Sequence, residues 1–125
     1  MVGSDEVFAL HMGPTPAIFG HALPSNKVFA YGGCFGPTTI DDINRLHCRA
    51  FVSSGLAGMC GLGMRDQNSI SIADELTGMH AELVCDPVIL YGYDMEIKDL
   101  QNPMKEPYMV VYAYDNKQES ECESD

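Results

Sequence analysis

The chain has 125 residues, of which 46% are hydrophobic, and its formal net charge is −11. This length suits one domain with a modest core, and the apolar content excludes a chain that is disordered throughout. The acidic charge argues against nucleic acid and anionic membrane surfaces as partners, because both require a basic face. No apolar run reaches the length of a membrane span. We therefore expect a globular protein without a membrane span.

The cysteines and histidines do not form a recognisable site in the sequence. The five cysteines are odd in number and include no Cys-x-x-Cys pair, and the four histidines are scattered. These spacings predict neither a disulfide framework nor a metal site. We expect reduced, mostly buried thiols in a cytoplasmic protein, with no cofactor. The cysteines are Cys34, Cys48, Cys60, Cys85 and Cys122.

The first predicted elements are strands that end at glycines. Met1-Val2 has the character of the last residues of a strand, which ends at Gly3-Ser4-Asp5. Residues Lys27 to Tyr31 form a run of β-forming character that stops at Gly32-Gly33. Such runs bounded by turn residues predict strands.

The middle of the chain alternates between helical and strand patterns. Thr39 to Phe51 has helical spacing of its apolar residues, and Gly55 is a suitable stop. The short apolar run from Met59 to Met64 predicts a buried strand. Asp66 to Thr77 is the clearest helix, with Asp66 as its cap and Gly78 as its stop.

Two further strands and an acidic tail complete the chain. Glu82 to Cys85 and Tyr108 to Tyr114 are predicted strands. Residues 116–125 are rich in acidic side chains and are predicted to be a disordered tail. Alternating strands and helices predict an α/β fold in which helices pack on a parallel sheet.

Three of the predicted strand ends carry polar or flexible residues. They are Gly3-Ser4-Asp5, the turn that begins at Gly32-Gly33, and Met64-Arg65-Asp66. In open α/β sheets, ligands bind beyond the carboxyl ends of the strands. These segments are therefore the candidate site.

Arg65 is the strongest candidate for contact with an anion. It directly precedes a helix, whose N-terminus offers unpaired N–H groups and positive potential, and its guanidinium matches carboxylate or phosphate. Asp66 would cap the helix, and Ser69 would order the first turn. The alternative is an ordinary surface arginine that pairs with Asp66 and has no role in ligand binding. Likewise, Gly32-Gly33 can admit a ligand or merely form a tight turn.

The ordered segments resemble the polysaccharide pyruvyl transferase family. Gly3 to Phe8 resembles its G-S-D-x-V-W segment, and Phe29 to Gly36 resembles its Y-A-x-S-F-G strand and turn. Gly63 to Ser69 resembles S-V-R-D-x-x-S, and Leu83 to Leu90 resembles a D-P-x-x-L-L strand. The chain departs from these patterns in two places.

The first departure is Phe8 where tryptophan is usual. The second is Cys34 where serine is usual, which places a hydroxyl role at that position in doubt. Cys34 as a nucleophile is the alternative to a buried structural thiol, although no base lies near it in the sequence.

The resemblance implies a Rossmann-like, three-layer parallel sheet with flanking helices, as part of the first domain of a GT-B-like enzyme. The implied reaction moves a pyruvyl group from phosphoenolpyruvate to a sugar of an exopolysaccharide or cell-wall glycan. It implies Arg65 as a donor contact and Asp5 as the catalytic acid/base candidate. The remaining candidate substrate-binding residues are Ser4, Gly32, Gly33, Asp66 and Ser69.

The resemblance also implies that residues 1–115 are only part of the family's first domain. Family members are longer, so we expect this chain to be truncated and inactive, or nearly so, on its own. The alternative is a non-catalytic α/β binding or assembly module, which would pair with a separately encoded partner or self-associate through an exposed sheet edge.

Overall fold

The computed structural model describes residues 1–11, 13–101 and 104–110. The chain divides into two compact units, Met1–Gly92 and Tyr93–Asp125. The second unit contains one helix among its described residues, α5 (Asp94–Asp99). The expected boundary between residues 115 and 116 lies outside the described residues.

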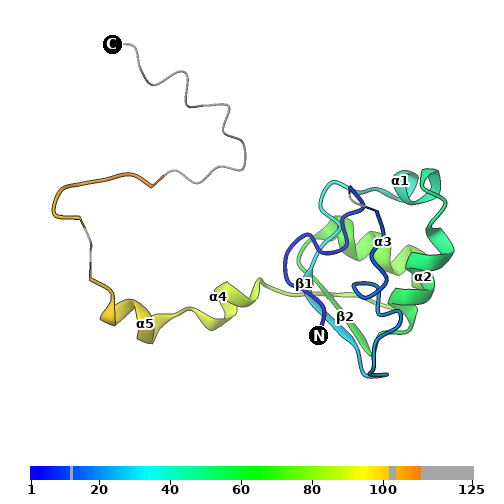
Figure 1. Cartoon of the computed structure of the whole chain (residues 1–125), viewed down its shortest axis with the longest axis horizontal. Helices are drawn as coiled ribbons and strands as arrows, with labels where there is room; N and C mark the ends of the chain where they lie inside the picture. Colours follow the sequence, from blue (N-terminus) through cyan, green and yellow to red (C-terminus); the bar gives the residue numbers. More distant parts are fainter. Residues whose placement is uncertain (12, 102–103, 111–125) are drawn as a thin grey trace, which may run out of the picture. The chain divides into compact units, whose positions relative to one another are not determined.

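The first unit is built on a small parallel sheet. Its strands are β1 (Phe29–Gly33), β2 (Gly61–Met64) and β3 (Glu82–Leu83), in the order β1-β2-β3. The neighbouring strands β1 and β2 are labelled in Figure 1. Both pairs are parallel, and helices connect successive strands. The predicted α/β class with a parallel sheet is therefore confirmed.

The N-terminal segment runs along the free edge of β1. Val2 and Asp5 form isolated parallel bridges with Ala30 and Gly33. The amide of Val2 donates to the carbonyl of Phe29, at 2.7 Å. The end of this segment therefore lies beside the ends of the regular strands.

The predicted helix over Thr39–Phe51 is wrong in its extent, because the structure has two helices. They are α1 (Ile40–Arg45) and α2 (Arg49–Ala57), separated at His47, which has a left-handed backbone with φ 53°. Gly55 does not stop α2 but lies inside it. A Cβ atom there would lie 2.2 Å from the carbonyl oxygen of Phe19, so the glycine permits close packing.

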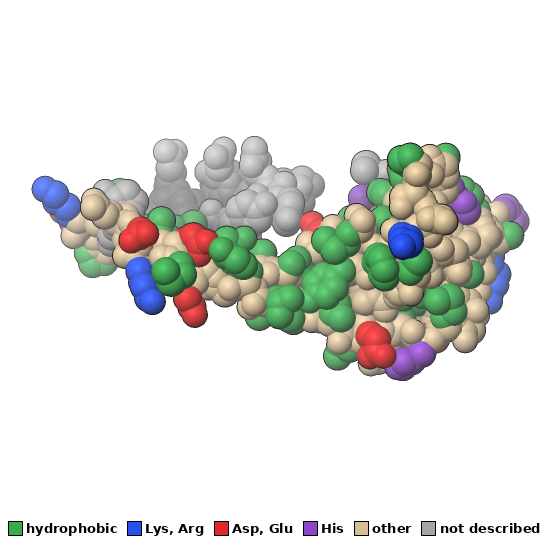
Figure 2. All heavy atoms as spheres, turned by 90° about the horizontal axis from the view of Figure 1, so that it is seen from below, with side chains coloured by type: hydrophobic (Ala, Val, Ile, Leu, Met, Phe, Trp, Pro, Cys, Tyr) green, Lys and Arg blue, Asp and Glu red, His purple; other side chains and the backbone are tan. Residues whose placement is uncertain are grey.

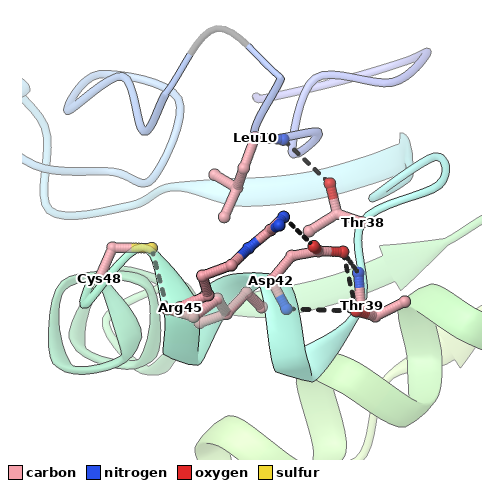
Figure 3. A network of polar contacts seen from close by, with 7 residues as sticks. Leu10, Thr38, Thr39, Asp42, Arg45 and Cys48 are labelled. Atoms are coloured by element: carbon pink, nitrogen blue, oxygen red, sulfur yellow. Dashed lines mark hydrogen bonds and ion pairs between the residues drawn. The ribbon is translucent and has the colours of Figure 1, made fainter.

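The N-terminus of α1 has the predicted capping box (Figure 3). The Thr39 hydroxyl accepts from the amide of Asp42, and the Asp42 carboxylate accepts from the Thr39 amide. Asp42 also forms an ion pair with Arg45. The hydrogen bonds from Thr39 lower the pKa of Asp42 below its usual value, because they favour the charged carboxylate.

The helix predicted over Asp66–Thr77 is confirmed as α3 (Gln67–Thr77). Asp66 is its N-cap, and Gly78 follows it in the left-handed conformation with φ 67°. Local capping signals therefore determine both ends of this helix.

The structure differs from two predictions for the segment that begins at Glu82. The strand is shorter than the predicted Glu82–Cys85, and the strand-like reading of Leu83 to Leu90 is wrong. Residues Pro87–Tyr91 form helix α4, in which the Asp86 side chain accepts from the amide of Val88. Proline is well suited to the first helical position, because it lacks the amide that would be unpaired there.

The last predicted strand, Tyr108 to Tyr114, is not observed in its described part. Residues 108–110 have no regular secondary structure. The remainder of that prediction lies outside the described residues.

The core lies on one face of the sheet, where α2 and α3 pack together. Its strand residues include Ala30, Leu62 and Met64, and its helix residues include Val52 and Leu56. Phe8 is fully buried against Phe19 and Phe35, with ring centroids 5.4 Å apart in each pair.

Within Met1–Gly92, the other face of the sheet is exposed beside Phe29, and the third layer that the resemblance implies is not seen among the described residues of this unit. Phe29 is 48% exposed on this face. Hydrophobic side chains are visible on the surface of this unit in Figure 2. A shallow hollow of about 430 Å³ is lined by Met1, Phe29, Ala30, Tyr31, Gly61, Leu62, Gly63 and Glu82.

The thiols are less buried than expected. Cys34 and Cys48 are buried, whereas Cys60 and Cys85 are exposed, and all four are free; Cys122 lies outside the described residues. Within the described part of the chain, no helix has the length and apolarity needed to cross a membrane.

Candidate functional site

The candidate site lies where the ends of neighbouring strands meet. Asp5 ends the N-terminal segment, Cys34 follows β1, Arg65 follows β2, and Asp86 lies shortly after β3. Because these segments run parallel, their carboxyl ends lie at the same edge of the sheet. The structure thus brings together the three strand ends selected from the sequence and adds a fourth.

Arg65 forms the centre of this edge. Its Nη2 atom donates to the Asp5 carboxylate at 2.9 Å, and its Nη1 atom donates to the Asp86 carboxylate at 3.3 Å. Its backbone amide donates to the carbonyl of Gly33, at 3.3 Å. The guanidinium therefore connects strand ends that are far apart in the sequence.

The two carboxylates differ in how firmly they are held. The Asp5 side chain is 74% exposed, whereas those of Arg65 and Asp86 are 29% and 25% exposed. Asp86 is further fixed by the amide of Val88, which donates to its other oxygen at 2.9 Å. Among the described residues, Arg65 is the partner found for the Asp5 carboxylate.

The surroundings of Arg65 favour its charged form. Hydrogen bonding with Cys34 and then with Asp5 raises the pKa of Arg65 above its usual value, which outweighs the opposing effect of burial. One cation faces two carboxylates, so the cluster carries net negative charge. In the observed arrangement, an incoming anion must compete with protein carboxylates for this guanidinium.

Asp66 and Ser69 support the site from within the protein. The Asp66 carboxylate accepts from the Ser69 amide at 2.8 Å and from its hydroxyl at 3.0 Å. The Ser69 hydroxyl in turn accepts from the amide of Phe35, at 2.8 Å, and is fully buried. The alternative pairing of Arg65 with Asp66 is not observed. These two residues order the backbone around the site, as predicted for Ser69.

The remaining candidates lie at the same edge in close contact with protein. A Cβ atom on Gly33 would lie 2.8 Å from a ring carbon of Phe8, so this glycine makes room for a buried side chain. On Gly32, a Cβ atom would lie 3.4 Å from that of Ser4 and 3.2 Å from Cδ of Pro87. The glycines thus serve the packing of the strand ends.

Sequence reasoning missed Asp86 as a partner of Arg65. It also missed Tyr31, whose pKa is raised by burial and then by the nearby Cys85 and Asp86. The available signal was position, because Asp86 directly follows the predicted strand Glu82–Cys85 just as Arg65 directly follows the predicted strand Met59–Met64. Their proximity depends on the strand order, which the sequence patterns did not reveal.

A model of the family described as polysaccharide pyruvyl transferase matches residues 1–123. The chain belongs to this family. Comparison with curated proteins and with solved structures gave no match. The match includes all the residues at the edge described above.

The chemistry available at this edge is that of charge and proton transfer. Arg65 can bind a carboxylate or phosphate through two parallel hydrogen bonds. The exposed Asp5 carboxylate can accept a proton from a hydroxyl group. No group of three metal-ligating side chains occurs among the described residues.

Proposed function

We propose that this chain contributes to the transfer of a pyruvyl group from phosphoenolpyruvate to a sugar of an exopolysaccharide or cell-wall glycan. The observation that carries the proposal is the family match over residues 1–123. The cluster at the strand ends supports it, because Arg65 is suited to an anionic donor and Asp5 to an acceptor hydroxyl.

In the proposed reaction, two sugar hydroxyls form a ketal with C2 of phosphoenolpyruvate, and the C2–O bond to phosphate breaks. One hydroxyl proton ends on the methylene carbon, and the other leaves with inorganic phosphate. Arg65 holds an anionic group of the donor. Asp5 accepts a proton from an attacking hydroxyl. Ser4, Gly32 and Gly33 shape the edge, while Asp66 and Ser69 hold its backbone.

Turnover at the proposed site requires cations beyond those of the described first unit, whereas binding of the donor to the chain requires Arg65. Phosphoenolpyruvate carries both a carboxylate and a phosphate, whereas Arg65 already faces two carboxylates. Arg45 and Arg49 pair with Asp42 and Glu75 on the helices. We propose that a second half of a GT-B-like cleft supplies the missing positive charge. The proposed reaction takes place in the cytoplasm, and the chain alone catalyses it slowly or not at all.

The test is to measure the affinity of the purified chain for phosphoenolpyruvate by calorimetry. Replacing Arg65 with alanine should abolish binding, and Arg65→Lys should weaken it because lysine cannot form the bidentate contact. Arg49→Ala is the matched control, since it removes an arginine from an exposed ion pair between α2 and α3. Equal affinity of the Arg65→Ala variant and the unaltered chain would contradict the assignment.

The second candidate function is an assembly module, and the open face of the sheet favours it. Parallel sheets are normally covered on both faces. We propose a second copy of the chain as the occupant of the hollow beside Phe29. Light scattering over a range of concentrations should then reveal a dimer that Phe29→Ser disrupts. A monomer at all concentrations would remove this candidate.

A further inference from the structure

The two carboxylates on Arg65 differ in their surroundings in a way that separates their roles. Asp86 is partly buried, caps α4 through Val88, and meets Nη1. Asp5 is largely exposed and meets Nη2 through a single ion pair. Exposed ion pairs contribute little free energy, whereas a partly buried carboxylate with a second hydrogen bond is costly to displace.

We propose that Asp86 is a positioning residue for Arg65, and that Asp5 occupies the place on Nη2 where an anionic group of the donor binds. This rests on the proposed function. The Asp5 carboxylate stands where a ligand carboxylate or phosphate oxygen would lie. When the donor binds, Asp5 leaves the guanidinium and Asp86 stays.

The backbone around Asp5 permits this exchange without a change of fold. The carbonyl of Asp5 accepts from the amide of Cys34 at 2.9 Å, and the residue is bridged to Gly33. The main chain is thus anchored to the end of β1, while the side chain remains 74% exposed. Rotation of the side chain alone releases the guanidinium.

The exchange links donor binding to the availability of Asp5. While Asp5 is paired with Arg65, its carboxylate oxygen is engaged by the guanidinium at 2.9 Å. Once the donor takes its place, the carboxylate loses this partner and can accept a hydrogen bond from the acceptor hydroxyl instead. The acceptor hydroxyl is then activated only when the donor is present, which disfavours unproductive chemistry.

Two isosteric variants separate this proposal from a simple effect of charge. Asp5→Asn removes the competing anion, so phosphoenolpyruvate should bind about two to five times more tightly, as expected when a weak ion pair no longer competes. Asp86→Asn removes the same charge but loosens the guanidinium, so the affinity should fall. Arg49→Ala should leave the affinity unchanged.

The outcomes are distinguishable from failure of the proposed function. Equal tightening in Asp5→Asn and Asp86→Asn would overturn the division of roles, because only net charge would then matter. Unchanged or weaker binding in Asp5→Asn would overturn the exchange. If neither variant nor the unaltered chain bound phosphoenolpyruvate, the donor assignment itself would fail, and the exchange would fall with it.

A spectroscopic measurement tests the positioning role independently of affinity. The sequence contains only the arginines at positions 45, 49 and 65, so their Nε–H signals can be assigned by substitution. Without ligand, the Arg65 signal should broaden or move toward that of a free arginine in Asp86→Asn, and much less in Asp5→Asn. The reverse order would overturn the assignment of Asp86. Thermal unfolding confirms that each variant is folded.

Discussion

Replacing Ser69 with alanine tests whether this residue supports the fold or contacts a ligand. The Ser69 hydroxyl is fully buried, accepts from the Phe35 amide at 2.8 Å and donates to Asp66 at 3.0 Å. Alanine leaves the Phe35 amide buried without its acceptor, which costs about 1–3 kcal/mol. Because Phe35 is itself fully buried, water cannot replace the lost acceptor easily.

We therefore expect Ser69→Ala to lower the free energy of unfolding by about 2 kcal/mol, or roughly 10 °C in melting temperature for a domain of this size. The matched control is Ser71→Ala on the same helix, where the exposed hydroxyl donates to the Gln67 carbonyl at 2.9 Å. This control should change stability by less than about 0.5 kcal/mol.

Urea unfolding followed by circular dichroism is a suitable assay, because the chain has no tryptophan. Equal stability of Ser69→Ala and Ser71→Ala would refute the reasoning from buried hydrogen bonds. The affinity for phosphoenolpyruvate, measured well below the melting temperature, separates the two roles. A supporting residue should leave it nearly unchanged, whereas a large loss would show that Ser69 reaches the ligand.

Two further substitutions test the packing and the capping. Gly33→Ala should destabilise the fold by about 1–3 kcal/mol in urea titrations, because its Cβ would lie 2.8 Å from the Phe8 ring and 3.0 Å from Val7; a neutral result would contradict the tight packing. Thr39→Ala should cost about 1 kcal/mol near neutral pH. Since the folded pKa of Asp42 is lowered from 3.8, its contribution is present above that pH and is lost as the pH falls through the lowered value, so this difference should shrink in acid. A difference independent of pH would contradict the role of Asp42.

The success of sequence reasoning depended on whether the decisive interaction was local. Helix α3 was predictable because Asp66 and Gly78 mark its ends through their own side-chain or backbone chemistry. The break at His47 was not predictable from helical spacing. The apolar residues on both sides, including Ile43 and Val52, are buried in the same core, and tertiary packing overrides the continuous pattern.

The same distinction explains the candidate site. Arg65 could be selected as a candidate because a charged residue directly precedes a helix. Its partners were not visible, since Asp86 is 21 positions away and Asp5 is 60 positions away. The shortening of β3 and the start of α4 depend on a cap at Asp86 that the family's strand-like pattern concealed.

The long sequence separation of the Arg65 ion pairs has a consequence for how the protein folds. Contacts between distant positions require closure of large loops, so they form only after the intervening strands and helices have docked. The Arg65 cluster is therefore a late product of folding, and its integrity reports on the order of the whole sheet. Partially folded chains that retain local helices would lack this cluster. Under the proposed function, the ability to bind a donor would therefore arise only when the topology is complete.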